Sequence, residues 1–177
     1  MKALAAAALA AMLALSACTA QAPGGPGGAP PVSKVRPPDL FGAWRASIDV
    51  QSGAFAQAKG LEFMYLFHSD RTMIESSNYD AAPPVPPAYG VWRMIPGDGT
   101  TFEAKYEFFT TAASPPDQFK GGAGWLPSGR GVFTERITVA MDGKTFTSVI
   151  AYELFDAKGT KIPGGGTASG RGTRIDF

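Results

Sequence analysis

The sequence predicts an all-β domain over residues 39–177, built as an eight-stranded antiparallel up-and-down β-barrel. Three observations lead to this fold. Apolar and polar residues alternate with a period of two, which is typical of half-buried strands. No stretch of twelve residues keeps a helical period of 3.6 between helix caps. Tight turns and long loops alternate along the chain, and antiparallel strands hide their edges most simply by closing into a barrel.

Each predicted strand is a run in which apolar residues recur at every second position. In the first run, Trp44, Ala46 and Ile48 share one face. In the fifth, Phe102 and Tyr106 alternate with charged residues, and the last run is rich in glycine. The predicted strands are 43–50, 61–68, 72–79, 89–95, 102–111, 132–141, 145–155 and 167–175.

Three of the connections are short and contain Asp-Gly or similar residues that favour β-hairpins: 69–71, 96–101 and 142–144. The others are three long loops and one intermediate connection, at 51–60, 80–88, 112–131 and 156–163. Alternate connections of a meander fall at opposite ends of the sheet. The short turns therefore predict a closed end of the barrel, and the long loops predict an open mouth.

Residues 1–17 predict a secretory signal peptide. Lys2 supplies a positive charge, and an unbroken apolar run of 13 residues extends from Ala3 to Leu15. A helix needs about 20 apolar residues to span a bilayer, so this run has the length of a signal-peptide core and not of a transmembrane anchor.

The run ends in Leu15-Ser16-Ala17-Cys18, which resembles the lipobox of bacterial lipoproteins. This resemblance implies cleavage before Cys18, diacylation of its thiol by palmitate-type chains, and acylation of the new amino group. Two or three acyl chains hold a soluble domain stably on a lipid bilayer. The alternative is ordinary cleavage after Ala17 or Ala20, which leaves a secreted protein with an incidental cysteine.

The lipoprotein resemblance also implies a place in the cell envelope. Because Thr19 is not Asp, the resemblance implies sorting to the outer membrane in a Gram-negative host, and otherwise an anchor at the outer face of the cell membrane. After Cys18, residues 18–38 predict a disordered tether. Ten of the twenty residues that follow the cysteine are Gly or Pro and none is aromatic, so they bury too little apolar surface to fold.

The two ends of the predicted domain carry short motifs. Gly42-Ala43-Trp44 opens the first strand and resembles the G-x-W signature of lipocalins and related calycin barrels. That resemblance implies that Trp44 plugs the closed end with Arg174, from the last strand, stacked on it. The sequence lacks the T-D-Y motif of lipocalins and a helix after the last strand. Its layout is also similar to uncharacterised bacterial secreted proteins that open with G-x-W and close with G-T-R-I.

Composition excludes several classes of function. One Cys excludes a disulfide framework and zinc sites built on Cys pairs, and one His excludes multi-His metal centres. A formal charge of +1 offers no basic excess for nucleic acid. The nucleophile-elbow, P-loop and dinucleotide motifs are missing. We therefore expect no metal, no cofactor and no nucleic-acid partner, and we expect a monomer.

Aromatic residues on the inward faces could line an apolar cavity with a few polar groups, which is the usual composition of a small-molecule site. Glu135 lies between Phe133 and Ile137 on the inward face, where burial is costly and raises a carboxyl pKa. A bulge in the strand would turn Glu135 outward. The candidate ligand-binding residues are Phe63, Tyr65, Trp92, Tyr106, Phe108, Glu135 and Tyr152.

Three functions fit these residues. The first is binding of a small apolar or amphipathic ligand. The second is isomerisation of a bound ligand in a barrel that resembles allene oxide cyclase, with Glu135, the one catalytic candidate, acting beside Tyr65 or Tyr152. The third is an interaction protein of the cell envelope with a filled barrel. A lumen of a few hundred Å³ would favour the first two, and a filled lumen the third.

Overall fold

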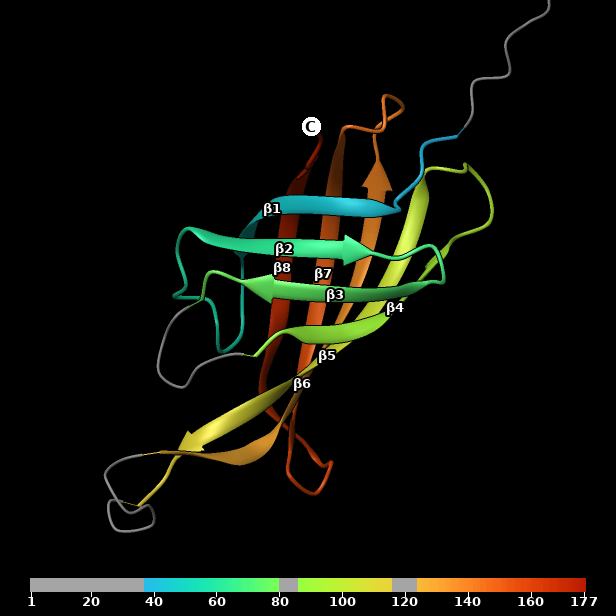
Figure 1. Cartoon of the computed structure of the whole chain (residues 1–177). Coiled ribbons are helices and arrows are strands. Elements are labelled where there is room, and N and C mark those ends of the chain that lie inside the picture. The colour runs from blue at the N-terminus through green and yellow to red at the C-terminus, as the bar shows by residue number, and fades with distance from the viewer. Residues whose placement is uncertain (1–36, 80–85, 116–123) are drawn as a thin grey trace, which may run out of the picture. The chain divides into compact units, whose positions relative to one another are not determined.

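Eight antiparallel strands form the computed structural model, which describes residues 37–79, 86–115 and 124–177 (Figure 1). The strands are β1 (Gly42–Val50), β2 (Leu61–Phe67), β3 (Thr72–Ser77), β4 (Ala88–Met94), β5 (Thr101–Ala113), β6 (Trp125–Val139), β7 (Thr145–Asp156) and β8 (Lys161–Arg174). Each is hydrogen-bonded to the next and β8 returns to β1, which confirms the predicted closed up-and-down barrel. None of the described residues forms a helix long and apolar enough to cross a membrane.

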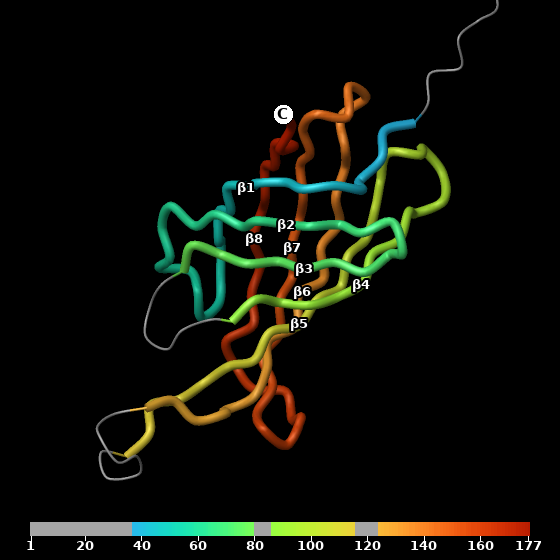
Figure 2. The backbone as a smooth tube through the Cα atoms, in the orientation of Figure 1, coloured from blue at the N-terminus to red at the C-terminus, as the bar shows by residue number. Residues whose placement is uncertain are grey.

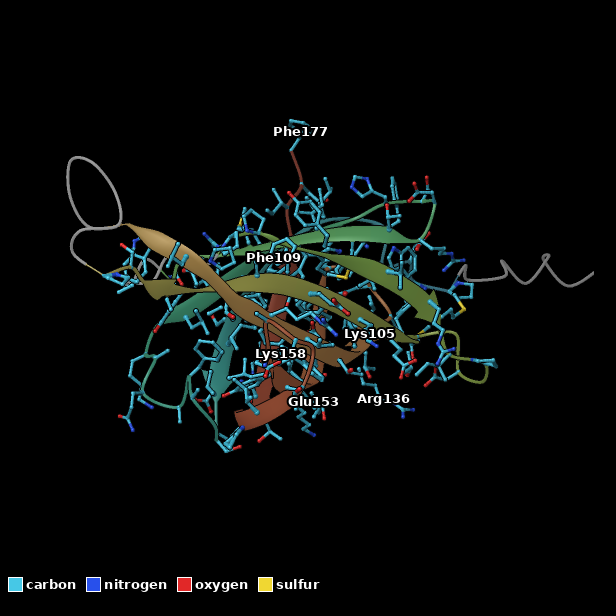
Figure 3. All side chains as sticks on the ribbon, turned by 90° about the horizontal axis from the view of Figure 1, so that it is seen from below. Lys105, Phe109, Arg136, Glu153, Lys158 and Phe177 are labelled. Atoms are coloured by element: carbon cyan, nitrogen blue, oxygen red, sulfur yellow. The ribbon has the colours of Figure 1, made fainter. Side chains whose placement is uncertain are left out.

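The barrel interior is built from alternate residues of each strand. Along β5, Phe102, Ala104 and Tyr106 are completely buried, whereas Lys105 is exposed. Successive side chains of a strand point to opposite faces, so one face of each strand packs into the lumen. Figure 3 shows Lys105 and Arg136 on the outside of the barrel, where both are exposed.

The short turns lie together at one end of the barrel, as predicted. A backbone hydrogen bond closes each: His68 N donates to Thr72 O, Ile95 N to Thr101 O, and Ala140 N to Thr145 O. β1 begins at this closed end, because its first residue, Gly42, pairs with Phe67 at the end of β2. The loop 51–60 that follows β1 therefore lies at the opposite end, which is the mouth.

Two Trp–Arg stacks occupy the closed end. The Arg174 guanidinium carbon lies 4.2 Å from the centre of the Trp44 ring, and the two residues are paired across β1 and β8. Trp44 is completely buried and its Nε1 donates a 2.8 Å hydrogen bond to Leu40 O. The second stack places Arg71 over Trp92 at 4.5 Å. Each such contact stabilises the fold by about 0.5–2 kcal/mol, depending on how far the cation is desolvated.

The prediction of a long loop at 112–131 is wrong at both ends, because 112–113 belong to β5 and 125–131 belong to β6. β5 and β6 continue to pair as far as Ala113 and Trp125, and they run side by side beyond the rest of the sheet (Figure 2). Glycine and proline in this segment indicated a loop. Glycine is needed here for packing, since a Cβ on Gly131 would lie 2.2 Å from a ring carbon of Phe108. A strand residue without a side chain makes room for an aromatic ring across the pair.

The connection between β7 and β8 is also shorter than predicted. β8 begins at Lys161 and not at 167, and Asp156 N donates to Thr160 O at 2.9 Å to close a tight turn. The other strand boundaries agree with the predicted ones to within two residues. The signal peptide, Cys18 and the tether as far as residue 36 lie outside the described residues, as do 80–85 and 116–123.

Candidate functional site

A small cavity lies in the lumen at the mouth. Its volume is about 40 Å³, which is room for a few water-sized groups and far below the few hundred Å³ of a typical ligand pocket. A depression of about 470 Å³ on the outer face of β1 is open to solvent beside Asp49, Glu62 and Arg171. The mouth cavity is lined by Ile48, Val50, Phe55, Leu61, Phe63, Glu75, Ser77, Tyr79, Phe108, Phe133, Ile150, Tyr152 and Ala168.

Loop 51–60 covers this cavity with the side chain of Phe55. The Phe55 ring packs at centroid distances of 5.3 Å from Tyr152, 5.8 Å from Tyr79 and 6.4 Å from Phe108. The Tyr152 hydroxyl binds the loop twice, because Tyr152 Oη accepts from Phe55 N at 3.2 Å and donates to Ser52 O at 2.8 Å. The aromatic side chain that closes the lumen therefore belongs to a loop and not to a strand.

Glu75 brings a carboxyl group into the mouth cavity from β3. Only 5% of the residue is exposed, and its Oε1 has no hydrogen-bond partner. Burial, together with the nearby charge of Glu135, raises the pKa of Glu75 to about 8. Glu75 pairs across the strands with Tyr65. At neutral pH the cavity therefore contains a protonated carboxylic acid with one unsatisfied oxygen.

Glu135 lies below the cavity in a hydrogen-bonded cluster. It is completely buried and points inward, as strand parity predicts. Tyr106 Oη donates to Glu135 Oε2 at 2.8 Å and Tyr65 Oη donates to the same oxygen at 3.1 Å. Burial raises the pKa of Glu135, and the hydroxyls of Ser148, Tyr106 and Tyr65 counter this only in part. Ser148 Oγ itself is buried without a hydrogen-bond partner.

The structure brings six of the seven predicted ligand-binding residues into the same lumen, at two levels. Phe63, Phe108 and Tyr152 line the mouth cavity. The other three, Tyr65, Tyr106 and Glu135, form the cluster beneath it. The seventh, Trp92, lies at the closed end, where its Nε1 donates to His68 O and its ring packs on Phe67 and Phe102. Trp92 therefore belongs to the plug of the barrel.

Sequence reasoning missed Glu75 and Phe55. Met73 and Ile74 are neighbours and both apolar, so alternation alone does not show which face of β3 points inward. Glu75 shares its parity with Met73 and Tyr79, and that pattern could have indicated an inward carboxyl. Phe55 is a single aromatic residue in a polar loop, and only the folded loop shows where its ring goes.

Comparison with known proteins finds no relative. No family model, no curated protein and no solved structure matches the chain.

The arrangement restricts what the carboxyl groups can do. Glu135 is enclosed by Tyr65 and Tyr106 and does not line the cavity, and the Tyr152 hydroxyl is bonded to the loop and not to Glu135. Glu75 is the carboxyl that faces free space. It can donate a hydrogen bond when protonated, or ionise beside a cation. Among the described residues, no three His, Cys, Asp or Glu side chains come together to hold a metal ion.

Proposed function

We propose that this protein binds a small apolar or amphipathic molecule in the mouth cavity, in the place that the Phe55 ring occupies in the closed form. The observation that carries the proposal is the buried Glu75 carboxyl, whose Oε1 lacks a partner and faces apolar space. A ligand group that bonded this oxygen would satisfy it.

A barrel filled only for stability has no need of Glu75. Burying a carboxyl without a full set of hydrogen bonds costs several kcal/mol, and an apolar residue of similar volume would stabilise the fold instead. Charged or titrating groups retained at such a cost are typical of functional sites. Glu75 therefore supports a site more strongly than it supports a solid core.

The volume of the cavity bears on the same proposal. By size alone, 40 Å³ favours the filled barrel. The filling ring, however, comes from a loop. This loop is bonded to the barrel through the Tyr152 hydroxyl, from Ala54 N to Gly164 O, and from Gln51 and Ser52 to β8. Displacing one partly exposed side chain opens the lumen without breaking a strand. A ligand therefore has to displace the Phe55 ring, and the free energy that this requires lowers the apparent affinity of the ligand.

The proposal includes the place of the protein in the cell. The lipobox-like Leu15-Ser16-Ala17-Cys18 supports acylation of Cys18 and an anchor in the envelope, in the outer membrane of a Gram-negative host or otherwise at the outer face of the cell membrane. The Trp44–Arg174 stack supports a lipocalin-like barrel. Palmitate labelling that is lost in Cys18→Ser tests the anchor.

Titration with 1-octanol, followed by NMR, tests ligand binding. We expect saturable shifts of the Ile150 and Ala168 methyl groups, which line the cavity. Phe55→Ala should raise the affinity about tenfold or more, because burying a Phe side chain is worth about 1.5–3 kcal/mol and the ligand no longer has to displace it. Phe41→Ala removes another partly exposed ring, at the closed end, and should leave the affinity unchanged. If neither wild type nor Phe55→Ala shows saturable shifts, the ligand-binding proposal fails.

A second function is favoured by the outer surface. Exposed apolar side chains lie together on β2, β3 and β4 and form what we call the apolar wall: Met64, Leu66, Ile74, Tyr89 and Val91. Leu66 faces Ile74 across the strands, and Ile74 faces Tyr89. Contiguous apolar patches on a soluble surface are typical of interaction sites. This wall supports the interaction protein as the alternative if the lumen binds nothing.

A further inference from the structure

We infer that the mouth cavity selects ligands whose buried head group is a protonated amine, which pairs with the Glu75 carboxylate. The inference rests on the proposed ligand-binding function and specifies its ligand class. Within the part of the chain that the structure describes, the lumen holds acidic groups without a balancing cation. Two carboxyl groups, Glu75 and Glu135, lie inside one barrel, and no Lys, Arg or His is among the residues that line the mouth cavity.

The titratable groups that face Glu75 come from several strands, and none is a cation. Tyr65 on β2, Tyr106 on β5 and Glu135 on β6 lie below it, and Tyr79 and Tyr152 lie with it around the cavity. The strands β1, β4 and β8 turn apolar residues toward the upper lumen, namely Ile48, Ala88 and Ala168. Arg174 and Arg71 lie on the tryptophans of the closed end.

The lumen therefore favours a positive charge that a ligand brings with it. An anionic head group would meet two carboxyl groups and no cation, which is unfavourable. A hydroxyl finds one donor or acceptor at Glu75 but no complementary charge. An ammonium group donates up to three hydrogen bonds and brings the positive charge that would neutralise an ionised Glu75. Charge-assisted hydrogen bonds of this kind are about twice as strong as neutral ones.

Binding then moves one proton. In the free protein at neutral pH the Glu75 carboxyl is protonated. When the ammonium enters, the O–H bond of the carboxyl breaks, its proton leaves to solvent, and an N–H···O bond forms between ammonium and carboxylate. With a Glu75 pKa of about 8, about nine tenths of a proton should be released per ligand at pH 7 and about one tenth at pH 9.

Calorimetry of the full chain with 1-octylamine, 1-octanol and octanoate tests the inference. Titrations in two buffers of different ionisation enthalpy count the protons released. The affinity for octylamine should rise about tenfold between pH 7 and pH 9, because the ionised fraction of Glu75 rises by that factor and an alkylamine with a pKa near 10.4 stays charged. The affinity for octanol should not rise over this range, and octanoate should bind most weakly at pH 7.

Two variants separate the role of Glu75 from a general effect of charge. Glu75→Gln keeps the size of the side chain and should lower octylamine affinity at pH 9 about tenfold or more, remove the proton release, and leave octanol within about twofold. Glu107→Gln removes an exposed carboxyl from the outer face of β5 and should change neither the octylamine affinity nor the proton release. The proton count on the wild-type protein tests the inference even if Glu75→Gln folds poorly.

The outcomes distinguish this inference from the function on which it rests. If none of the three octyl compounds binds, the proposed function fails. If octanol or octanoate binds as tightly as octylamine, or octylamine binds without releasing a proton at pH 7, the lumen is a ligand site but the amine inference is overturned. Amine-selective binding with proton release that Glu75→Gln abolishes supports both.

Discussion

Glu75 and Glu135 are two acids in one apolar lumen, and the charge of Glu135 makes Glu75 harder to ionise. The shared hydrogen bonds go to Glu135, which receives the Tyr65 and Tyr106 hydroxyls, so the unsatisfied oxygen is left on Glu75. Burial and the Glu135 charge raise the pKa of Glu75 from 4.5 to about 8. A carboxyl in this state titrates in the range where cells work, and it stays neutral until a cation or a rise in pH ionises it.

The raised pKa of Glu75 predicts how stability depends on pH. Between pH 4.5 and 8 the folded chain keeps a proton that the unfolded chain has lost, so the free energy of unfolding should fall as pH rises through this range. The full loss is on the order of 5 kcal/mol for a pKa raised from 4.5 to about 8. Glu75→Gln should remove most of this slope. Urea unfolding at pH 5, 6, 7 and 8 measures it.

Glu135 also has a raised pKa, and its contribution has the same sign, so Glu75→Gln should keep a smaller slope. Glu107→Gln, on the outer face, should keep the full slope. An equal slope in Glu75→Gln and the wild type would show that the Glu75 carboxyl ionises normally in the folded protein.

Single residues show how far sequence reasoning reaches. Strand parity places Glu135 correctly, because Phe133 and Ile137 on either side are unambiguous inward residues. The same reasoning does not find Glu75, because Met73 and Ile74 are adjacent and both apolar, so alternation does not show which face of β3 points inward. Trp92 points inward, as strand parity predicts, but it lies at the closed end of the barrel and not at the mouth. Alternation tells which face a residue is on, whereas its height in the barrel depends on the register of the neighbouring strands.

At the scale of elements, loop 51–60 is the part of the site most open to change. Its contacts with the barrel include the two hydrogen bonds of the Tyr152 hydroxyl, a bond from Ala54 N to Gly164 O and bonds from Gln51 and Ser52 to β8. Segments held by few buried contacts open locally at low free energy. The loop is therefore the element that should move when a ligand enters.

Tyr152→Phe should loosen this loop while keeping the ring that lines the cavity. Loss of the bonds to Phe55 N and Ser52 O should cost about 1–2 kcal/mol and speed hydrogen exchange of the Phe55 amide. Tyr89→Phe removes an exposed hydroxyl on the outer wall and should leave that exchange unchanged. Hydrogen exchange read by mass spectrometry over residues 51–60 makes the measurement. Unchanged exchange in Tyr152→Phe would mean that other contacts hold the loop.

The strands also show why the sequence predicts the number of elements better than their lengths. All eight strands are found, but β6 and β8 each begin in glycine-rich segments that look like loops. Glycine in these strands makes room for aromatic rings on the neighbouring strand, as Gly131 does for Phe108 and Gly172 for Phe146. That use of glycine depends on which residues face each other across the sheet, which composition does not reveal.

At the scale of the whole barrel, the outer surface has two different sides. The apolar wall on β2, β3 and β4 exposes large aliphatic and aromatic side chains in adjacent positions. The outward positions on β6, β7 and β8 are mainly threonine, serine and arginine, with Trp125, Val149 and Ile162 as exposed apolar exceptions. In Figure 1, β2 to β4 cross in front of β6 to β8, so the two sides belong to opposite walls. Such a division indicates that one wall is used for contact.

The apolar wall predicts that equal substitutions on the two walls have unequal effects. Val91 is 58% exposed on the apolar wall and Val149 is 66% exposed on the opposite wall. Each faces a cation across the sheet, Lys105 for Val91 and Arg136 for Val149, so a glutamate at either place gains the same kind of neighbour. Both variants should stay within about 0.5 kcal/mol of the wild type in stability, as exposed substitutions usually do.

Val91→Glu should nevertheless shorten retention on a hydrophobic-interaction column clearly more than Val149→Glu. The reason is that a charge on Val91 is placed in the apolar wall, two residues along β4 from Tyr89, whereas a charge on Val149 replaces an apolar side chain that faces Arg136 and Ser169 across the strands. Equal retention of the two variants would mean that the apolar residues of β2, β3 and β4 act singly and form no docking surface. In that case the lumen beneath Phe55 would remain as the site of function, and octyl-ligand binding would decide between a carrier and a barrel without a ligand.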